Sequence, residues 1–344
     1  MNKMEINLIS DTVTKPTPGM LEMMWNAKVG DDVFRSDPTV NLLEEKAAAM
    51  FGMDAALFCP SGTMTNQIAI KLHTRPLDEM ICDATSHVFQ YEVAGYAFHS
   101  GIGVNLIEGN YGKITADQVQ EAIKSLADWL PKSTLVVLEN TTNKGGGNYY
   151  TLDEIIPIKN ICSNKGLKLH LDGARLFHAL VETGDSTKNY GEVFDSISIC
   201  LSKGLGAPVG SLLIGNKEFI NEARRIRKVM GGGMRQAGFL AAAGVYALDN
   251  HVNRLKTDHF NAKEIADCLE KLDYVKSVKP VKTNIIIFDL QDSWTANVFL
   301  EKLAKNGVKA SAFGPKTIRF VTHLDVSDEM IQQVKKILKS ISAG

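Results

Sequence analysis

The sequence predicts an α/β protein built on a mostly parallel sheet, with helices on both faces. Short apolar runs near residues 55, 80, 103, 135, 168 and 197 have the character of strands, and stretches with helical spacing separate them. Such alternation is typical of parallel sheets, because each parallel connection needs a crossover segment. Strands at 285–288 and 317–321 and a helix ending near 341 indicate a smaller α/β unit. We therefore expect a large domain over 1–250, including the N-terminal segment, and a small C-terminal domain over 251–344.

Composition and charge are those of a folded globular protein. The chain has 344 residues, of which 44% are hydrophobic and 22% are charged, so it can bury more than one core. Its formal net charge of −1 offers no basic surface for nucleic acid or an anionic membrane. No apolar run is long enough to span a bilayer, and the first residues lack the apolar core of a signal peptide. Five scattered cysteines without metal-type spacing indicate reduced thiols, so we expect a cytoplasmic protein.

Apolar spacing and turn residues define the individual elements. Val40, Leu43, Ala47 and Met50 share one helical face, which predicts a helix over 39–51. Further helices are expected at about 18–26, from the 60–66 segment to residue 73, from residue 87, at about 115–125, and through a long region from 238 to about 272. The run 209–215 follows the strand near 197 too closely for a helical crossover, so we expect it to pair antiparallel.

Two charged residues follow consecutive candidate strands. Asp172 ends the run 167–172, and Lys203 follows the run 196–200 in a turn that contains Gly204 and Gly206. Pyridoxal phosphate needs a lysine that forms a Schiff base with its aldehyde and a carboxylate that keeps its ring nitrogen protonated. The pair therefore favours a pyridoxal phosphate site, although either residue alone is more often a solvated charge at a strand end.

Hydroxyl-rich segments offer two interpretations each. Ser61, Gly62 and Thr63 stand between a strand and a helix, where unpaired N–H groups at the helix N-terminus can bind a phosphate. Serine and threonine also cap helices that bind nothing. The run 10–14 can likewise cap the next helix or bind an anionic group.

Other candidate residues lie in loops and at helix starts. His87 begins a short helix, with Glu92 just over one turn further on; it is either structural or a ring that stacks on a cofactor and titrates near neutral pH. The buried strand 134–140 ends in a glycine-rich loop, at the edge where open α/β sheets bind ligands. The basic run 224–228 is a solvated face by default, whereas Arg235, beside three glycines, is well placed for a phosphate.

A series of motifs along nearly the whole chain resembles the low-specificity L-threonine aldolases. They are Ser-Asp-Thr-Val-Thr at 10–14, Val-Gly-Asp-Asp-Val at 29–33, Ser-Gly-Thr at 61–63, Glu-Asn-Thr at 139–141, Asp-Gly-Ala-Arg at 172–175, Cys-Leu-Ser-Lys-Gly-Leu-Gly at 200–206, Gly-Gly-Gly-Met-Arg-Gln at 231–236 and Arg-Phe-Val-Thr-His-Leu-Asp at 319–325. The resemblance implies the aspartate-aminotransferase-like fold of pyridoxal phosphate enzymes, fold type I. It also implies a homotetramer built from dimers.

The same resemblance implies a role for each candidate residue. Lys203 would form the Schiff base, Asp172 would hold the ring nitrogen and His87 would stack on the ring, and these three are the expected catalytic residues. The rest of the expected cofactor-binding set is Ser61, Gly62, Thr63, Ser202, Arg175 and Arg235, with Arg235 contributed by a neighbouring subunit. The expected substrate-binding residues are Ser10, Arg175, Arg319, Thr142, Phe34 and Glu92, of which Ser10 and the two arginines would bind the substrate carboxylate. No metal ligand is expected.

The implied reaction is cleavage of L-threonine or L-allo-threonine to glycine and acetaldehyde. A β-eliminating lyase, or an aldolase for phenylserine-like substrates, would use the same anchor residues and is the alternative; a non-enzymatic scaffold would need neither Asp172 nor Lys203. Two positions depart from the family pattern, since Thr142 stands where histidine is usual and Phe34 where tyrosine is usual. Threonine cannot act as a base near neutral pH, so we expect His87 or an ordered water to accept the proton.

Overall fold

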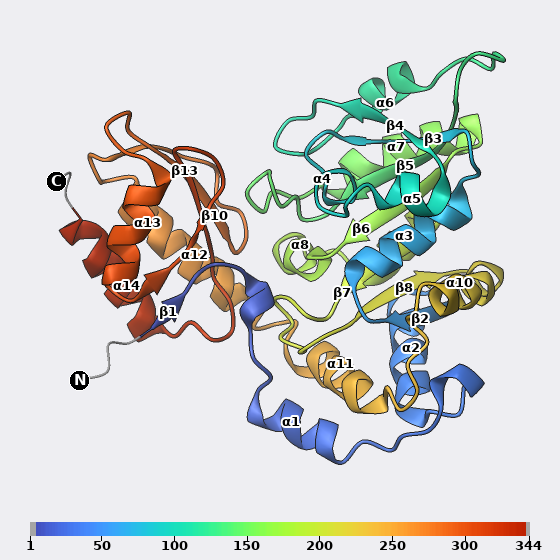
Figure 1. The fold of residues 1–344 in the computed structure, drawn as a ribbon, viewed down its shortest axis with the longest axis horizontal. Coiled ribbons are helices and arrows are strands. Elements are labelled where there is room, and N and C mark those ends of the chain that lie inside the picture. The colour runs from blue at the N-terminus through green and yellow to red at the C-terminus, as the bar shows by residue number, and fades with distance from the viewer. Residues whose placement is uncertain (1–4, 342–344) are drawn as a thin grey trace.

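A seven-stranded sheet forms the centre of the larger of two units in the computed structural model, which describes residues 5–341 (Figure 1). Its strands are β2 (Ala55–Cys59), β3 (Asp78–Asp83), β4 (Gly103–Ile107), β5 (Lys132–Glu139), β6 (Lys168–Gly173), β7 (Ser196–Cys200) and β8 (Ser211–Gly215). They lie in the order β2-β8-β7-β6-β5-β3-β4. The pairs from β7 through β6, β5 and β3 to β4 are parallel, and β8 is antiparallel to both of its neighbours. The mostly parallel sheet and the antiparallel strand at 209–215 are thus confirmed.

Helices cover both faces of this sheet, as predicted. Along β3, Met80 packs in one apolar cluster with Ile70, whereas the next residue, Ile81, packs in another with Ile155. This alternation follows from the two-residue period of a strand and buries both faces. The helices of the larger unit are α1 (Pro18–Trp25), α2 (Pro38–Phe51), α3 (Gly62–His73), α4 (His87–Gln90), α5 (Gly95–Ser100), α6 (Ala116–Ala122), α7 (Leu152–Lys165), α8 (Leu176–Thr183), α9 (Thr187–Val193), α10 (Lys217–Val229) and α11 (Gly238–Asn250).

Local sequence explains where helix α2 begins and ends. The Asp37 carboxylate accepts hydrogen bonds from the backbone N–H groups of Thr39 and Val40, and Pro38 occupies the first helical turn, where a missing N–H costs nothing. At the other end, Gly52 adopts a φ of 64°, the left-handed conformation that ends many helices. The long helical region predicted from 238 to 272 is divided into α11 and α12 (Leu255–Leu269).

The smaller unit contains a four-stranded antiparallel sheet (Figure 1). Its order is β12 (Ser311–Ala312), β13 (Thr317–Val321), β10 (Ile285–Leu290) and β9 (Val275–Val278). Helices α12, α13 (Ala296–Lys305) and α14 (Asp328–Ser340) contribute to the core beside it. Phe288 is fully buried there and meets Phe299 and Phe320 edge-on, with ring centroids 5.8 and 5.2 Å apart.

The N-terminal segment joins the smaller unit, which the sequence pattern does not reveal. Strand β1 (Ile6–Asn7) pairs in parallel with β11 (Val308–Lys309), and Ile6 and Leu8 are buried in the smaller core. The chain then crosses to the larger unit, whose core includes Met20. The division near residue 250 stays a prediction. Among residues 5–341, no helix combines the length and hydropathy needed to cross a membrane.

Replacing Phe288 with alanine should lower the free energy of unfolding by about 3–5 kcal/mol, because it removes a buried ring from two edge-on contacts and leaves a cavity. Phe260→Ala is the matched control, since that ring is 63% exposed and its loss should change stability by less than about 0.5 kcal/mol. Urea unfolding followed by circular dichroism measures both. Equal effects of the two substitutions would contradict this account of the core.

Candidate active site

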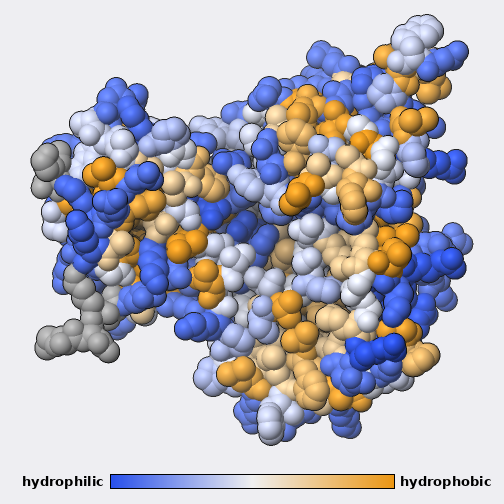
Figure 2. All heavy atoms as spheres, viewed as in Figure 1, coloured by the Kyte–Doolittle hydropathy of each residue, from blue (hydrophilic) through white to orange (hydrophobic). Residues whose placement is uncertain are grey.

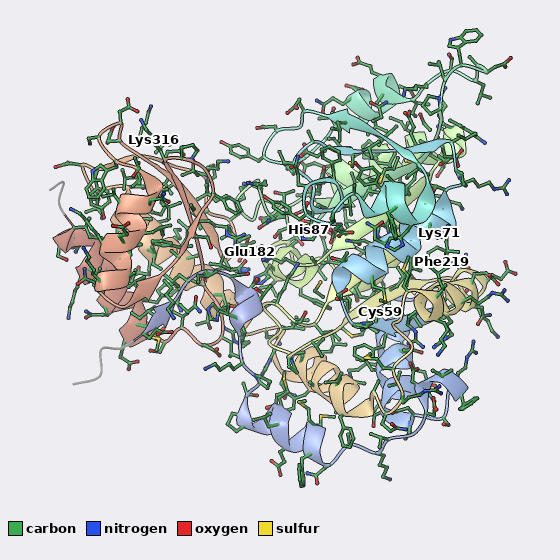
Figure 3. All side chains as sticks on the ribbon, viewed as in Figure 1. Cys59, Lys71, His87, Glu182, Phe219 and Lys316 are labelled. Atoms are coloured by element: carbon green, nitrogen blue, oxygen red, sulfur yellow. The ribbon has the colours of Figure 1, made fainter. Side chains whose placement is uncertain are left out.

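Eight of the predicted site residues meet at the carboxyl ends of β6 and β7. The parallel register pairs Asp172 with Ser198, and Lys203 follows three residues after the end of β7. Between them lies a cavity of about 150 Å³. It is lined by Ser61, Gly62, Thr63, Asn66, His87, Glu92, Asp172, Ala174, Cys200, Ser202 and Lys203. Figure 3 shows that His87 lies on the side of the larger unit that faces the smaller one, and Figure 2 shows this face hollowed between the two units.

Lys203 and Asp172 present unpaired polar atoms to this cavity. Lys203 is half-buried, and its ammonium makes no hydrogen bond or ion pair within the described part of the chain. Asp172 is buried, and its Oδ1 accepts a hydrogen bond from the Ala174 N–H at 3.2 Å, so Oδ2 is left for another donor. A reactive amine and a buried carboxylate therefore share one small cavity.

The N-terminus of α3 closes another side of the cavity. Ser61 Oγ accepts from the Met64 N–H at 3.2 Å and caps the helix, so both interpretations of the segment, capping and anion binding, remain compatible with this geometry. The backbone N–H groups of Gly62 and Thr63 have no acceptor among residues 5–341. A Cβ at Gly62 would lie 2.7 Å from Cys200 Sγ, so only glycine lets β7 and α3 approach this closely. The helix end can therefore bind an anion.

His87 is oriented by a buried carboxylate. Its Nδ1 lies 3.0 Å from Glu92 Oε1, and Glu92 also accepts from Asn66 Nδ2 at 2.9 Å and from Gln67 Nε2 at 2.6 Å. Burial acts to lower the pKa of His87, but the hydrogen bond to Glu92 and the charges of Asp172 and Glu92 outweigh it and raise the pKa above its ordinary value. The interaction with Glu92 leaves Nε2 as the imidazole atom free for chemistry.

Glu139 lies behind His87 at the end of β5. It is 6% exposed, and its two carboxylate oxygens accept from the backbone N–H groups of His87 at 2.7 Å and Asn143 at 2.8 Å. Burial, followed by the charge of Asp172, raises the pKa of Glu139 to about 7, and the two N–H groups oppose this rise. It is the register partner of Asp172 in the sheet, so two buried carboxylates stand side by side.

Arg319 reaches the junction of the two units from β13. Its Nη1 donates to Asn143 Oδ1 and its Nη2 donates to the Ile9 carbonyl, each at 2.9 Å. Its buried Nε has no acceptor, and no carboxylate lies within ion-pair distance among residues 5–341. Burial and the charge of Arg175 lower the pKa of Arg319 to about 10. A half-buried cation with an unused N–H suits a carboxylate ligand.

Arg175, expected at both the cofactor and the substrate, is held by a carboxylate of the protein itself. Its Nε and Nη2 donate to the two oxygens of Asp11 at 2.8 and 2.7 Å, and both side chains are buried. Although burial acts to raise the pKa of Asp11, the charge and hydrogen bond of Arg175 lower it far below its usual range. The neighbouring Ser10 Oγ accepts from the Thr12 N–H and so caps the turn at 11–13. Ser10 directly follows Ile9, whose carbonyl accepts a hydrogen bond from Arg319.

The structure does not bring Thr142, Phe34 or Arg235 to the cavity within one chain. Thr142 is buried, and its hydroxyl lies within hydrogen-bond distance of the Tyr111 carbonyl at 2.8 Å, so it fastens two loops together. Phe34 is 76% exposed, and its ring lies 6.0 Å from the Arg235 guanidinium. Arg235 itself pairs with Asp31 at 2.8 Å.

Four polar residues of the site were not predicted: Asp11, Asn66, Glu139 and Asn143. Asp11 and Glu139 stand inside motifs that the sequence displays, beside residues that were singled out. Acidic residues next to a buried strand or a hydroxyl run are a usable signal, because an acid there must find a partner. Asn66 and Asn143 carry no such signal, since their partners Glu92 and Arg319 are distant in the sequence.

Replacing Glu92 with glutamine should lower the pKa of His87, because the amide keeps the hydrogen-bond oxygen but removes the negative charge. Folding raises this pKa, so protonated His87 stabilises the fold below its ordinary value of 6.5, and this contribution is lost as the pH rises through the folded pKa. Glu92→Gln should therefore reduce the pH dependence of stability that His87 causes. Histidine-selective NMR titration measures the pKa, with the exposed Glu329→Gln as control. An unchanged His87 titration in Glu92→Gln would contradict this coupling.

Replacing Asp11 with asparagine should lower the free energy of unfolding by about 3 kcal/mol, since it leaves the Arg175 charge buried without a counter-ion. The Asp292–Lys316 pair provides the control, because both side chains are exposed and Asp292→Asn should have no measurable effect. Denaturant unfolding at neutral pH compares the two variants. Equal free energies of unfolding in the two variants would mean that the buried Asp11–Arg175 pair does not stabilise the fold.

Comparison with known proteins places the chain in a family. The family model described as "Beta-eliminating lyase" matches residues 7–293. A low specificity L-threonine aldolase of Escherichia coli K12 is 40% identical over 331 residues, covering 96% of this chain and 97% of that protein. Low-specificity L-threonine aldolase 1 of Arabidopsis thaliana is 38% identical over 329 residues, covering 94% and 92%.

Solved structures support the same fold. That of Leishmania major threonine aldolase superposes with a TM-score of 0.84 at 21% identity, covering 97% of this chain and 98% of that one. Serine palmitoyltransferase of Sphingomonas wittichii gives a TM-score of 0.77 at 17% identity, covering 98% and 86%. The predicted fold type I architecture is confirmed by these likenesses. The chain belongs to the beta-eliminating lyase family and, within it, to the low-specificity L-threonine aldolases, and it is a lyase.

Proposed function

We propose that this protein cleaves the Cα–Cβ bond of L-threonine and L-allo-threonine to give glycine and acetaldehyde, with pyridoxal 5′-phosphate as cofactor. The observation that carries the proposal is the convergence of an unpaired lysine, a buried carboxylate and a free helix N-terminus on one cavity. The names of relatives at 36–40% identity, which are low-specificity L-threonine aldolases, support the substrate. The reaction would connect threonine breakdown with glycine supply.

The residues around the cavity fit the cofactor. Lys203 has the free amine that an aldehyde requires, Asp172 has an oxygen free for a ring N–H, and α3 presents unpaired N–H groups to a phosphate. Ser61 and Ser202 line the same space. When bound, pyridoxal phosphate supplies an electron-accepting ring that stabilises negative charge at the substrate Cα. His87, Glu92 and Asp172 place their ligand atoms within 4.8 Å of one another, and we assign this cluster to the organic ring and not to a metal.

Arg319 is the principal group proposed for the substrate carboxylate. Its guanidinium is fixed by Asn143 and the Ile9 carbonyl, so it binds a carboxylate without first losing side-chain freedom. Arg175 lies at the same junction but its charge is neutralised by Asp11, so we propose that it orients this pocket. A fixed carboxylate sets the direction of the Cα–Cβ bond relative to the ring.

His87 is the proposed acceptor of the β-hydroxyl proton, at Nε2. Glu92 at Nδ1 favours the tautomer that leaves Nε2 unprotonated and stabilises the imidazolium once the proton arrives. The Thr142 hydroxyl is committed to carbonyl groups and cannot take this role. His87 is the only histidine among the described residues that line the cavity, so no second imidazole distinguishes the two configurations of the hydroxyl-bearing carbon. Both diastereomers should therefore be substrates.

The alternative reactions are not favoured, because the relatives carry aldolase names. Arg235 and Phe34 are exposed on a single chain, and this supports the proposal that they complete the site of a neighbouring subunit in a homotetramer. We further propose a cytoplasmic location, a small amino acid as the ligand, and no association with nucleic acid or membrane, in line with the near-neutral charge.

The first test is acetaldehyde release from L-threonine and L-allo-threonine. The parent enzyme should release it from both, with kcat/KM values within about tenfold of each other. Lys203→Ala should lose about a thousandfold or more, because the amine that holds the cofactor is gone. The control is Lys316→Ala, since the Lys316 ammonium lies at the surface and pairs with the exposed Asp292. Its kcat/KM should equal that of the parent. Parent protein that holds the cofactor but releases no acetaldehyde would refute the proposed reaction.

A further inference from the structure

We propose that Glu139 is a positioning residue that fixes the imidazole side of the site relative to its substrate-carboxylate side. The inference rests on the proposed function, in which His87 handles the proton and Arg319 binds the substrate. Glu139 is not among the residues that line the cavity.

A continuous series of hydrogen bonds passes through this carboxylate. Oε2 accepts from the His87 N–H at 2.7 Å, and Oε1 accepts from the Asn143 N–H at 2.8 Å. The Asn143 side chain in turn accepts from Arg319 Nη1 at 2.9 Å. Glu139 therefore joins two loops of the larger unit, and through Asn143 it holds an arginine of the smaller unit.

Helix α4 depends on this contact because it has no cap of its own. Ser86, the residue before it, makes no side-chain cap within the described part of the chain. The Glu139 carboxylate supplies the missing acceptor at the first residue of α4. His87 is thus held at its backbone by Glu139 and at its ring by Glu92.

The chemistry of the position calls for a carboxylate. Two backbone N–H groups need two acceptor oxygens, whereas a glutamine offers one oxygen and an NH₂ that would face an N–H. A carboxylate here is unfavourable in other respects, since it is buried beside Asp172. The other groups that face it are His87, Arg175, Tyr150 and Cys82. The double acceptor function offsets the cost of burying this charge.

Glu139→Gln tests the proposal in the holoenzyme. One of the two N–H groups loses its acceptor, so kcat/KM for L-threonine should fall roughly tenfold or more. The pKa of His87, read by histidine-selective NMR titration, should fall as well, because a nearby negative charge is gone. The matched control is Glu79→Gln, a buried carboxylate at the opposite end of the neighbouring strand β3, paired with Lys124 and Ser133. It should leave both quantities unchanged.

Asn143→Ala tests the second half of the link on a half-buried loop residue. It keeps the backbone N–H that Glu139 binds but removes the oxygen that holds Arg319. KM should rise roughly tenfold while kcat changes less than about twofold. If Glu139→Gln does not fold, the KM of Asn143→Ala still tests the positioning role.

The outcomes separate the two proposals. The positioning role is supported if folded Glu139→Gln has a lower kcat/KM and a lower His87 pKa, and if KM rises in Asn143→Ala. The positioning role is overturned if Glu139→Gln has the same thermal stability as Glu79→Gln and keeps the kcat, the KM and the His87 pKa of the parent. If Glu139→Gln does not fold, an unchanged KM in Asn143→Ala overturns it. A parent that releases no acetaldehyde refutes the proposed reaction instead, and the His87 titration then still tests the contact.

Discussion

The parallel pairing of β6 with β7 is the constraint on which the site depends. Because both strands run in one direction and are held in register from His170 to Gly173, the residues that follow them emerge at one edge of the sheet. Asp172 and Lys203 meet there although thirty residues separate them. Strand β8 then returns antiparallel and pairs with β2 on its other side. The start of α3, which follows β2, therefore lies beside Cys200 at the end of β7. One sheet register thus places the amine, the carboxylate and the helix end together.

Buried carboxylates give this arrangement its rigidity. Glu92 holds the ring of His87, Glu139 holds its backbone, and Asp11 holds Arg175. Each is buried, and each has its oxygens matched to specific donors, so moving any one of them leaves a charge or an N–H without a partner. This is the physical condition for a site whose groups act at fixed distances.

The two units meet through the same polar groups. Asp11 accepts from Asn284 of the smaller unit at 3.3 Å while it pairs with Arg175 of the larger one. Arg319 of the smaller unit donates to Asn143 of the larger unit and to Ile9 of the N-terminal segment. The substrate-carboxylate pocket proposed here is therefore a product of both units, and the relative placement of the units decides whether it exists.

The sequence by itself determined the architecture and most of the residues that line the cavity. Strand and helix periods specify a parallel sheet, and the motifs around Asp172, Lys203, Gly62 and His87 are local, so their place at strand and helix ends follows from the chain itself. Only the tertiary structure decided the partners. Four findings depend on contacts between distant segments. Asp11 neutralises Arg175, and Thr142 links two loops. Glu139 accepts from two N–H groups, and residues 6–8 join the smaller unit. Such contacts leave no periodic signal, because a buried polar group needs only one partner, wherever in the chain that partner lies.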